Sequence, residues 1–258
     1  MSRIAGRLAL VTGASSGIGT ACARRFAAEG AHLALWARRG ERLSALAAQL
    51  AGAHGVTARS AVVDVRDRAA VNRAATALVD ARAVPDILVN SAGLASGLSK
   101  VQEGDPEDWD RMIDTNVKGL LNVTRAILPH MIARGSGHVV NLGSTAGHMT
   151  YPMGNVYNAT KFAVRALTEG MNLDVAGTPI RVSSVDPGFV ETEFSEVRFH
   201  GDRARAKGVY QGFRPLSAED VADVIAYVVN LPEHVNILDC IVVPTAQRNI
   251  YVVDRRGS

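Results

Sequence analysis

Tyr157 and Lys161 are the two residues whose types and spacing point most directly to chemistry. They lie four residues apart in a stretch with helical periodicity, Gly154–Val175, so both side chains should project from one helix face. An ammonium group beside a phenol favours the phenolate, and the spacing therefore predicts a Tyr157 pKa below its ordinary value. A phenol of that kind serves as a general acid or base. Such pairs also arise by chance, so the interpretation depends on further residues.

Ser144 and Asn116 extend this candidate site. Ser144 follows the apolar run His138–Leu142 and should lie at the sheet edge where α/β proteins bind ligands. Its hydroxyl is placed to hold a carbonyl oxygen beside Tyr157, or it only closes the turn after the strand. Asn116 lies inside a long predicted helix, where an amide can disturb the backbone hydrogen bonds and hold water. The alternative for Asn116 is a buried, hydrogen-bonded structural role.

A glycine-rich octapeptide, Thr12–Gly19, stands between an apolar run and a helical pattern. Gly13 permits a tight turn, Gly17 lets backbone approach a phosphate, and Gly19 lets the helix pack close to the strand. The helix N-terminus then offers N–H groups and partial positive charge to the anion. We therefore predict that this turn holds the pyrophosphate of a dinucleotide. The predicted contacts are Gly13, Ser15, Ser16, Gly17, Ile18 and Gly19.

The choice of dinucleotide depends on the end of the second predicted strand. An acidic residue that binds a ribose diol is usual about 20 residues beyond the glycine turn, but Arg38 and Arg39 stand there. Guanidinium groups suit a phosphate, so we predict that Arg38 above all binds the 2′-phosphate of NADP(H). In the alternative, both arginines are solvent-exposed charges at the start of the following predicted helix.

Residues after the third and fourth predicted strands complete the predicted cofactor contacts. Asp64 is placed to accept a hydrogen bond from adenine, or else it caps the following turn. Small residues after the fourth strand let backbone pass close to a ribose, with a plain turn as the alternative. These contacts are assigned to Asp64, Val65, Asn90, Ala92 and Gly93.

Strand-like and helix-like segments alternate along the chain. The predicted strands are Leu8–Thr12, His32–Trp36, Ala58–Val63, Ile87–Val89, His138–Leu142, Arg181–Val185 and Cys240–Val243. The predicted helices are Gly17–Glu29, Glu41–Leu50, Arg68–Ala81, Pro106–Ile132, Gly154–Val175 and Ala218–Val229, with Asp105 and Ser217 as N-caps. Pro129 should bend or end the fourth helix.

This rhythm predicts one α/β domain over residues 1–258. We expect a doubly wound Rossmann fold with a seven-stranded parallel sheet flanked by helices on both faces. The long segment at about 188–215 breaks the rhythm, and we predict that it forms a lid over the substrate.

Composition excludes several classes of function. Hydrophobic residues make up 47% of the 258-residue chain, the net charge is +3, and the basic residues are scattered, so neither disorder nor nucleic-acid binding is predicted. An early first strand and two distant cysteines suggest a cytoplasmic protein without a signal peptide. No apolar run is long enough to span a membrane. The seven histidines show no paired ligand spacing, so no metal site is predicted.

Together these motifs resemble the short-chain dehydrogenase/reductase family over essentially the whole length. The matching residues are Thr12–Gly19, Asn90–Gly93, Asn116, Ser144, Tyr157, Lys161 and Pro187-Gly188. The resemblance implies a catalytic tetrad in which Tyr157 is the acid/base, Ser144 orients the carbonyl or alcohol, Lys161 binds the nicotinamide ribose and Asn116 anchors a relay water. It also implies cofactor contacts from Tyr157, Lys161, Pro187, Gly188, Val190 and Thr192. The family usually has Asn where Ser91 stands.

A narrower resemblance is to the NADP-dependent 3-hydroxy acid (serine, L-allo-threonine) dehydrogenase subgroup, which implies oxidation of the 3-hydroxyl of small hydroxy or amino acids and reduction of related carbonyls. The subgroup usually has Glu where Asp186 stands. Reduction of bulkier ketones or 3-oxoacyl substrates is the alternative, and a non-catalytic NADP-sensing protein is the other class. Arg198 either binds a substrate carboxylate or pairs with Glu193 or Glu196. Candidate substrate contacts are Ser144, His148, Met153, Phe189, Phe194 and Arg198. The family resemblance implies a homotetramer.

Overall fold

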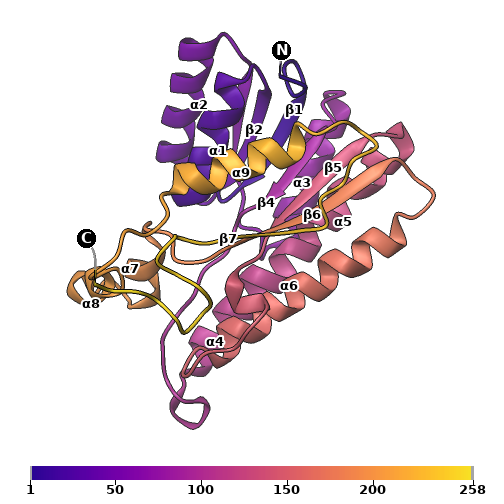
Figure 1. Ribbon diagram of the computed structural model, residues 1–258. Helices are drawn as coiled ribbons and strands as arrows, with labels where there is room; N and C mark the ends of the chain where they lie inside the picture. Colours follow the sequence, from indigo (N-terminus) through magenta and orange to yellow (C-terminus); the bar gives the residue numbers. More distant parts are fainter. Residues whose placement is uncertain (1, 257–258) are drawn as a thin grey trace.

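The computed structural model describes residues 2–256 and contains one seven-stranded sheet. The strands are β1 (Leu8–Thr12), β2 (His32–Ala37), β3 (Ala58–Val62), β4 (Ile87–Asn90), β5 (Gly137–Leu142), β6 (Ile180–Pro187) and β7 (Asp239–Val242). Their spatial order is β3-β2-β1-β4-β5-β6-β7, and every neighbouring pair is parallel. The predicted doubly wound parallel sheet is confirmed (Figure 1).

Helices cover both faces of this sheet. The long helices are α1 (Gly17–Ala28), α2 (Gly40–His54), α3 (Arg68–Asp80), α5 (Leu120–Arg134), α6 (Asn155–Asp174) and α9 (Ala218–Val229), and shorter ones are α4 (Pro106–Ile113), α7 (Phe194–Arg198) and α8 (Arg203–Gly208). Single 3-10 turns lie at Val101–Glu103 and Thr145–Gly147. Helices α1, α2 and α9 pack on one face, and α3, α5 and α6 pack on the other (Figure 1).

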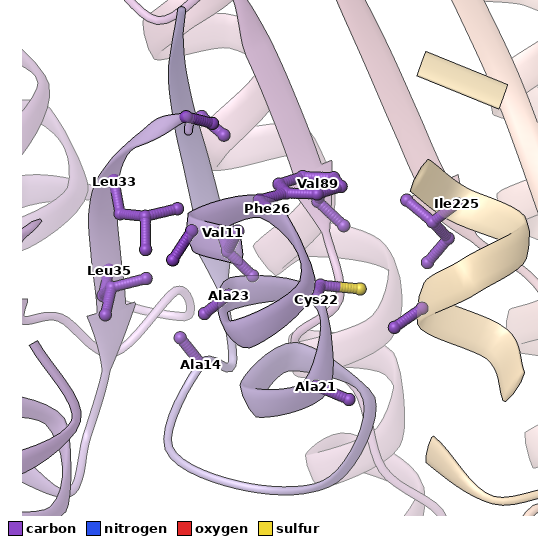
Figure 2. Packing of buried hydrophobic residues seen from close by; sticks show 14 of the residues in the cluster. Val11, Ala14, Ala21, Cys22, Ala23, Phe26, Leu33, Leu35, Val89 and Ile225 are labelled. Atoms are coloured by element: carbon purple, nitrogen blue, oxygen red, sulfur yellow. The ribbon is translucent and has the colours of Figure 1, made fainter. Parts of the chain in front are cut away.

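Two apolar layers hold the helices to the sheet. Alternate strand residues point to opposite faces, so Val11 packs in the layer under α1 while Leu10 packs in the layer under α5. Figure 2 shows the first layer, where Phe26 and Cys22 of α1 lie between strand residues such as Val89 and Ile225 of α9. Because both faces are covered, the strands read as continuous apolar runs in the sequence.

The fourth predicted helix is the main departure from the expected elements. The segment is helical from Pro106 to Arg134, but a π-helical turn, Asp114–Gly119, interrupts it around Asn116. The predicted disturbance at Asn116 is thus present. Of the two outcomes predicted for Pro129, a bend or an end, the helix does not end there: α5 continues to Arg134, close to the predicted end at Ile132. Ile127 and Met131 are buried against the sheet on either side of Pro129, and this packing offsets the roughly 3 kcal/mol that proline costs inside a helix.

The two predicted N-caps, Asp105 and Ser217, are confirmed. Asp105 accepts a hydrogen bond from the Glu107 N–H at 2.9 Å, and Pro106 occupies the first turn of α4. Ser217 and Asp220 form a reciprocal capping box at α9. Beyond β7, the C-terminal segment lies beside α7 and α8 (Figure 1). In the part of the chain that the structure describes, no helix is both long and apolar enough to cross a membrane.

His138 gives the fold a predicted sensitivity to acid. This β5 side chain is buried, and burial followed by repulsion from Arg181 lowers its pKa to about 3. The unfolded chain takes up the proton near pH 6.5, so the folded state loses stability as the pH falls from about 6.5 toward 3, by up to about 1.4 kcal/mol per pH unit. We expect His138→Gln to flatten this part of the pH dependence, as measured by urea unfolding between pH 7 and pH 5. Equal slopes for the two proteins would contradict the assignment.

Candidate active site

A cleft of about 270 Å³ opens where β1, β2, β3 and β4 end. It is lined by backbone and side chains from the glycine turn, the ends of β2 and β3, the turn after β4, and the segment that leads into α7. The predicted cofactor contacts that line it are Gly13, Ser15, Ser16, Gly17, Ile18, Gly19, Arg38, Arg39, Asp64, Val65, Ala92, Gly93 and Thr192. Residues that are scattered through the sequence therefore meet at one sheet edge.

The glycine turn is shaped by close backbone contacts. Gly13 has a φ of +67°, and a Cβ there would lie 2.9 Å from the Cα of Ala92. A Cβ on Gly19 would lie 2.5 Å from the Gly13 carbonyl oxygen. The Ser16 side chain makes no hydrogen bond that caps α1, so the first N–H groups of the helix remain directed at the cleft. The turn has the features of an anion cradle.

The two arginines at the end of β2 differ in their partners. Arg39 donates to Glu193 at 2.8 Å and to the Ser15 hydroxyl at 3.2 Å. Within residues 2–256, no carboxylate lies at ion-pair distance from Arg38. Asp64 forms a two-pronged ion pair with Arg66, and this contact lowers the pKa of the Asp64 carboxyl. Asp64 therefore lines the cleft as a carboxylate that already has a partner.

Asn90 differs from its predicted cofactor role. Its amide donates to the Thr124 hydroxyl at 3.0 Å and to the Asn141 amide oxygen at 2.9 Å, and the side chain is buried. It therefore ties β4 to α5 and β5 and does not line the cleft. Parallel pairing sets Asn90 opposite Asn141, and a sequence does not reveal that the two amides will bind each other inside the fold.

A second cavity of about 150 Å³ adjoins the cleft and is lined by the predicted catalytic residues Ser144, Tyr157 and Lys161. Tyr157 and Lys161 lie on one face of α6, with the Lys161 Nζ atom 5.9 Å from the centre of the Tyr157 ring. Lys161 donates to the Leu142 carbonyl at 2.8 Å. The Ser144 hydroxyl donates to the Pro187 carbonyl at 3.4 Å and accepts from the Ala146 N–H at 3.1 Å.

The pKa of Tyr157 is raised, which corrects the prediction that Lys161 lowers it. Burial is the main cause, the charge of Tyr151 adds to it, and a hydrogen bond with Ser144 acts in the opposite direction. Burial also lowers the pKa of Lys161, to about 8. Four-residue spacing places the two side chains on one face, but the ammonium is directed at the Leu142 carbonyl and contributes little at the phenol oxygen.

Asn116 lies behind the cavity. Its amide donates to the Leu94 carbonyl at 2.8 Å and to the Thr160 hydroxyl at 3.0 Å, and its oxygen accepts from the Leu94 N–H at 2.9 Å. Both amide protons are therefore already bound. Asn116 holds the turn after β4 against α6, and the relay water implied by the resemblance stays a prediction.

The predicted substrate residues divide into two groups. Phe189, Phe194 and Arg198 line the second cavity together with Ser144, and Pro187, Gly188, Val190 and Thr192 line it as well. Met153 lines a small neighbouring hollow with Tyr157 and Arg198. His148 lines neither cavity, because its Nε2 atom contacts the Asp186 carboxylate. The direct substrate contact predicted for His148 is therefore not present.

Among the residues that the structure describes, Arg198 has no acidic partner. Its guanidinium donates to the Tyr151 hydroxyl and to the Gly97 carbonyl at 3.4 Å, and it lies 5.4 Å from the ring centres of both Tyr151 and Tyr157. Glu193 pairs with Arg39 and Arg42, and Glu196 pairs with Arg203. The alternative in which Arg198 pairs with one of these glutamates is therefore wrong.

Three residues with metal-ligating groups meet in space although their sequence spacing gave no sign of it. One ligand atom each from His148, Asp186 and Asp239 lies within 4.8 Å of the others. His148 and Asp186 contact each other directly, so the His148 ring nitrogen and the Asp186 carboxylate already have a hydrogen-bond partner in each other.

A family model described as short chain dehydrogenase matches residues 7–202. The chain belongs to this family. The matched range includes the glycine turn and Asn116, Ser144, Tyr157 and Lys161, the residues that carry the family resemblance.

Relatives in the short chain dehydrogenase family match almost the full length. The chain is 47% identical over 250 residues to sulfoacetaldehyde reductase 2 of Chromohalobacter salexigens, covering 96% of this chain and 98% of the relative. It is 44% identical over 241 residues to the NADP-dependent 3-hydroxy acid dehydrogenase YdfG of Salmonella typhi, covering 93% and 96%. A structure described as the closed form of serine dehydrogenase complexed with NADP+ superimposes with a TM-score of 0.89, at 44% identity, covering 93% and 96%.

Two residues of the site escaped sequence reasoning. Tyr210 lines the second cavity and donates to the Val190 carbonyl at 2.8 Å. Gln247 accepts from the Phe189 N–H at 3.0 Å, and a Cβ on Gly188 would lie 2.1 Å from the Gln247 amide oxygen. Both residues lie in segments without a regular pattern, and only the folded chain brings them to β6.

Proposed function

We propose that this protein is an NADP(H)-dependent oxidoreductase that transfers a hydride between nicotinamide and a secondary alcohol, a ketone or a 3-hydroxy acid. The observation that carries the proposal is that Ser144, Tyr157 and Lys161 lie in a cavity adjoining the glycine-turn cleft. Relatives named as NADP-dependent dehydrogenases, and a related serine dehydrogenase structure with NADP+, support the same cofactor and reaction class.

The residues of the larger cleft fit NADP(H). Gly13 and Gly19 leave space that a Cβ would fill, and the start of α1 offers N–H groups to the pyrophosphate. Arg38 supplies a guanidinium for the 2′-phosphate at the other end of the cleft. Val190, Thr192, Pro187 and Gly188 lie around the second cavity, where the nicotinamide would extend.

The catalytic step assigns one task to each polar side chain. Bound NADP(H) supplies or accepts the hydride. Because the raised pKa keeps Tyr157 protonated at neutral pH, its hydroxyl serves as the general acid that protonates the carbonyl oxygen during reduction. Ser144 donates a hydrogen bond to the same oxygen and holds it near Tyr157. Lys161 binds the nicotinamide ribose and carries positive charge close to the reacting groups at neutral pH, since its pKa is about 8.

Arg198 selects a small anionic substrate in this proposal. Its guanidinium is anchored by Tyr151 and Gly97, it lines the cavity that contains Ser144, and it has no acidic partner among residues 2–256. A planar guanidinium suits a carboxylate or a sulfonate. The names of the 3-hydroxy acid dehydrogenase and sulfoacetaldehyde reductase relatives fit such substrates. The aromatic lining from Phe189, Phe194 and Tyr210 favours bulkier ketones as the second candidate.

Initial rates with NADPH test both candidates. We expect kcat/KM to be higher for small carbonyl compounds with a carboxylate or sulfonate than for neutral ketones of equal size. Arg198→Leu should lower kcat/KM for the anionic substrates about 30-fold, since a charge-assisted hydrogen bond is lost, and should change the value for neutral ketones by less than about threefold. An equal loss for both classes would contradict a role in anion recognition, and absence of NADPH oxidation with every carbonyl would contradict the proposed function.

The proposal also covers the domain organisation, the segment over the substrate, the oligomeric state and the location in the cell. We infer that residues 1–258 act as one domain in which about 188–215, including α7 and α8, close over the substrate. This inference is supported by the contribution of Phe194, Arg198 and Tyr210 to the second cavity. A homotetramer and a cytoplasmic location stay predictions.

A further inference from the structure

The loop that carries Ser144 is attached to the fold on two sides. On one side, Lys161 of α6 donates to the Leu142 carbonyl, and the Gly147 backbone packs so closely on Lys161 that a Cβ there would lie 2.7 Å from the Lys161 carbonyl oxygen. On the other side, His148 at the end of the loop contacts the Asp186 carboxylate of β6. The first attachment is made by Lys161, one of the proposed catalytic residues. The second is made by His148 and Asp186, which take no part in the proposed catalytic step.

The Asp186 side chain is built into this position. It is 2% exposed, its second oxygen accepts from the Ser184 hydroxyl, and a Cβ on Gly143 would lie 1.8 Å from it. The glycine before Ser144 thus allows the Asp186 carboxylate to sit directly beneath the loop. Asp239 of β7 lies 3.7 Å from His148 Nε2, on the outer side of the same contact.

This contact lies next to the groups that determine where the Ser144 hydroxyl points. Pro187, the residue after Asp186, provides the carbonyl that accepts from Ser144. Ala146, two residues before His148, provides the N–H that donates to Ser144. Moving His148 away from β6 would therefore shift both hydrogen-bond partners of Ser144 relative to each other.

We propose that His148 and Asp186 form a positioning pair that fixes the Ser144 hydroxyl against the substrate carbonyl. The inference rests on the proposed function and deepens it: His148 touches no substrate but sets the geometry of a residue that does. A displacement of about 1 Å in a group that orients the reacting carbonyl is enough to reduce a rate by an order of magnitude or more. The pair should therefore affect kcat and leave cofactor binding unchanged.

The test is a double-mutant cycle between His148 and Ser144. We expect His148→Leu to lower kcat about tenfold while KM for NADPH stays within about twofold. His148→Gln, whose amide can still donate to Asp186, should restore most of the rate. In a Ser144→Ala background, His148→Leu should lower the rate by less than about twofold, because the hydroxyl that it positions is gone. The rates of the slow variants are measured as single-turnover NADPH oxidation with enzyme in excess. If His148→Leu does not fold, His148→Asn takes its place in the cycle.

Two results would overturn the proposal. One is a wild-type kcat in His148→Leu and His148→Asn. The other is an equal loss in the wild-type and Ser144→Ala backgrounds, which would indicate a structural effect that does not act through Ser144. These results are distinct from a failure of the proposed function, in which no carbonyl substrate supports NADPH oxidation by the wild-type enzyme itself.

Discussion

We expect Tyr157→Phe to lower kcat for carbonyl reduction by at least about 10³-fold, because the substitution removes the proton donor and little else. The ring is buried and packs edge to face on Phe194, with 5.5 Å between the ring centres, so phenylalanine fits the same space. Steady-state NADPH oxidation gives the rate, and quenching of protein fluorescence by NADPH gives the affinity. The Kd for NADPH should change by less than about threefold, since we propose that the glycine turn and Arg38 supply most of the cofactor contacts.

Tyr210→Phe is the matched control. The half-buried Tyr210 side chain also lines the second cavity, and its hydroxyl hydrogen-bonds to the Val190 carbonyl and to Ser195. Its loss should reduce kcat by less than about tenfold, because it supports the wall of the cavity and transfers no proton. Retained turnover in Tyr157→Phe, or an equal loss in both variants, would exclude Tyr157 as the general acid.

The sheet was predictable because each strand is a short apolar run bounded by turn residues. All seven strands lie where the sequence places them, with ends that differ by one or two residues. Burial of both faces accounts for the inner strands such as β1, β2 and β4, which are apolar at nearly every position, whereas the edge strands β3 and β7 carry exposed residues. The irregular helix between Pro106 and Arg134 was only partly predictable. The sequence indicates a helix that runs past Pro129 to Ile132 and a disturbance at Asn116, but it does not reveal that the disturbance takes the form of a π-helical turn over Asp114–Gly119.

The candidate site shows a similar division. The sequence identified the glycine turn, Ser144, Tyr157 and Lys161, because their spacing places them on known edges and faces of the fold. It did not reveal the direction of a side chain within its surroundings. Asn90 turns toward Asn141, Lys161 toward the Leu142 carbonyl, and His148 toward Asp186.

Two of the polar contacts in the site join residues that are far apart in the chain. His148 and Asp186 are 38 residues apart, and Arg39 and Glu193 are 154 residues apart. Such contacts form only when distant segments of the chain fold together, and the sequence holds no local pattern for them. The difference between Arg38 and Arg39 arises in this way. Glu193 forms an ion pair with Arg39, whereas Arg38 lines the cleft and has no acidic partner in residues 2–256.

Arg38→Asp should therefore reverse the preference for NADPH. The substitution removes a charge-assisted hydrogen bond to the 2′-phosphate, places a like charge beside it, and offers a carboxylate to the ribose diol of NADH. These effects sum to roughly 4 kcal/mol, so the ratio of kcat/KM for NADPH to that for NADH should fall about 10³-fold. Arg42→Asp changes the net charge equally on the same surface but does not line the cleft, and it should alter the ratio by less than about threefold. A ratio that Arg38→Asp leaves unchanged, or a wild-type enzyme that uses NADH as well as NADPH, would show that the 2′-phosphate is not bound at Arg38.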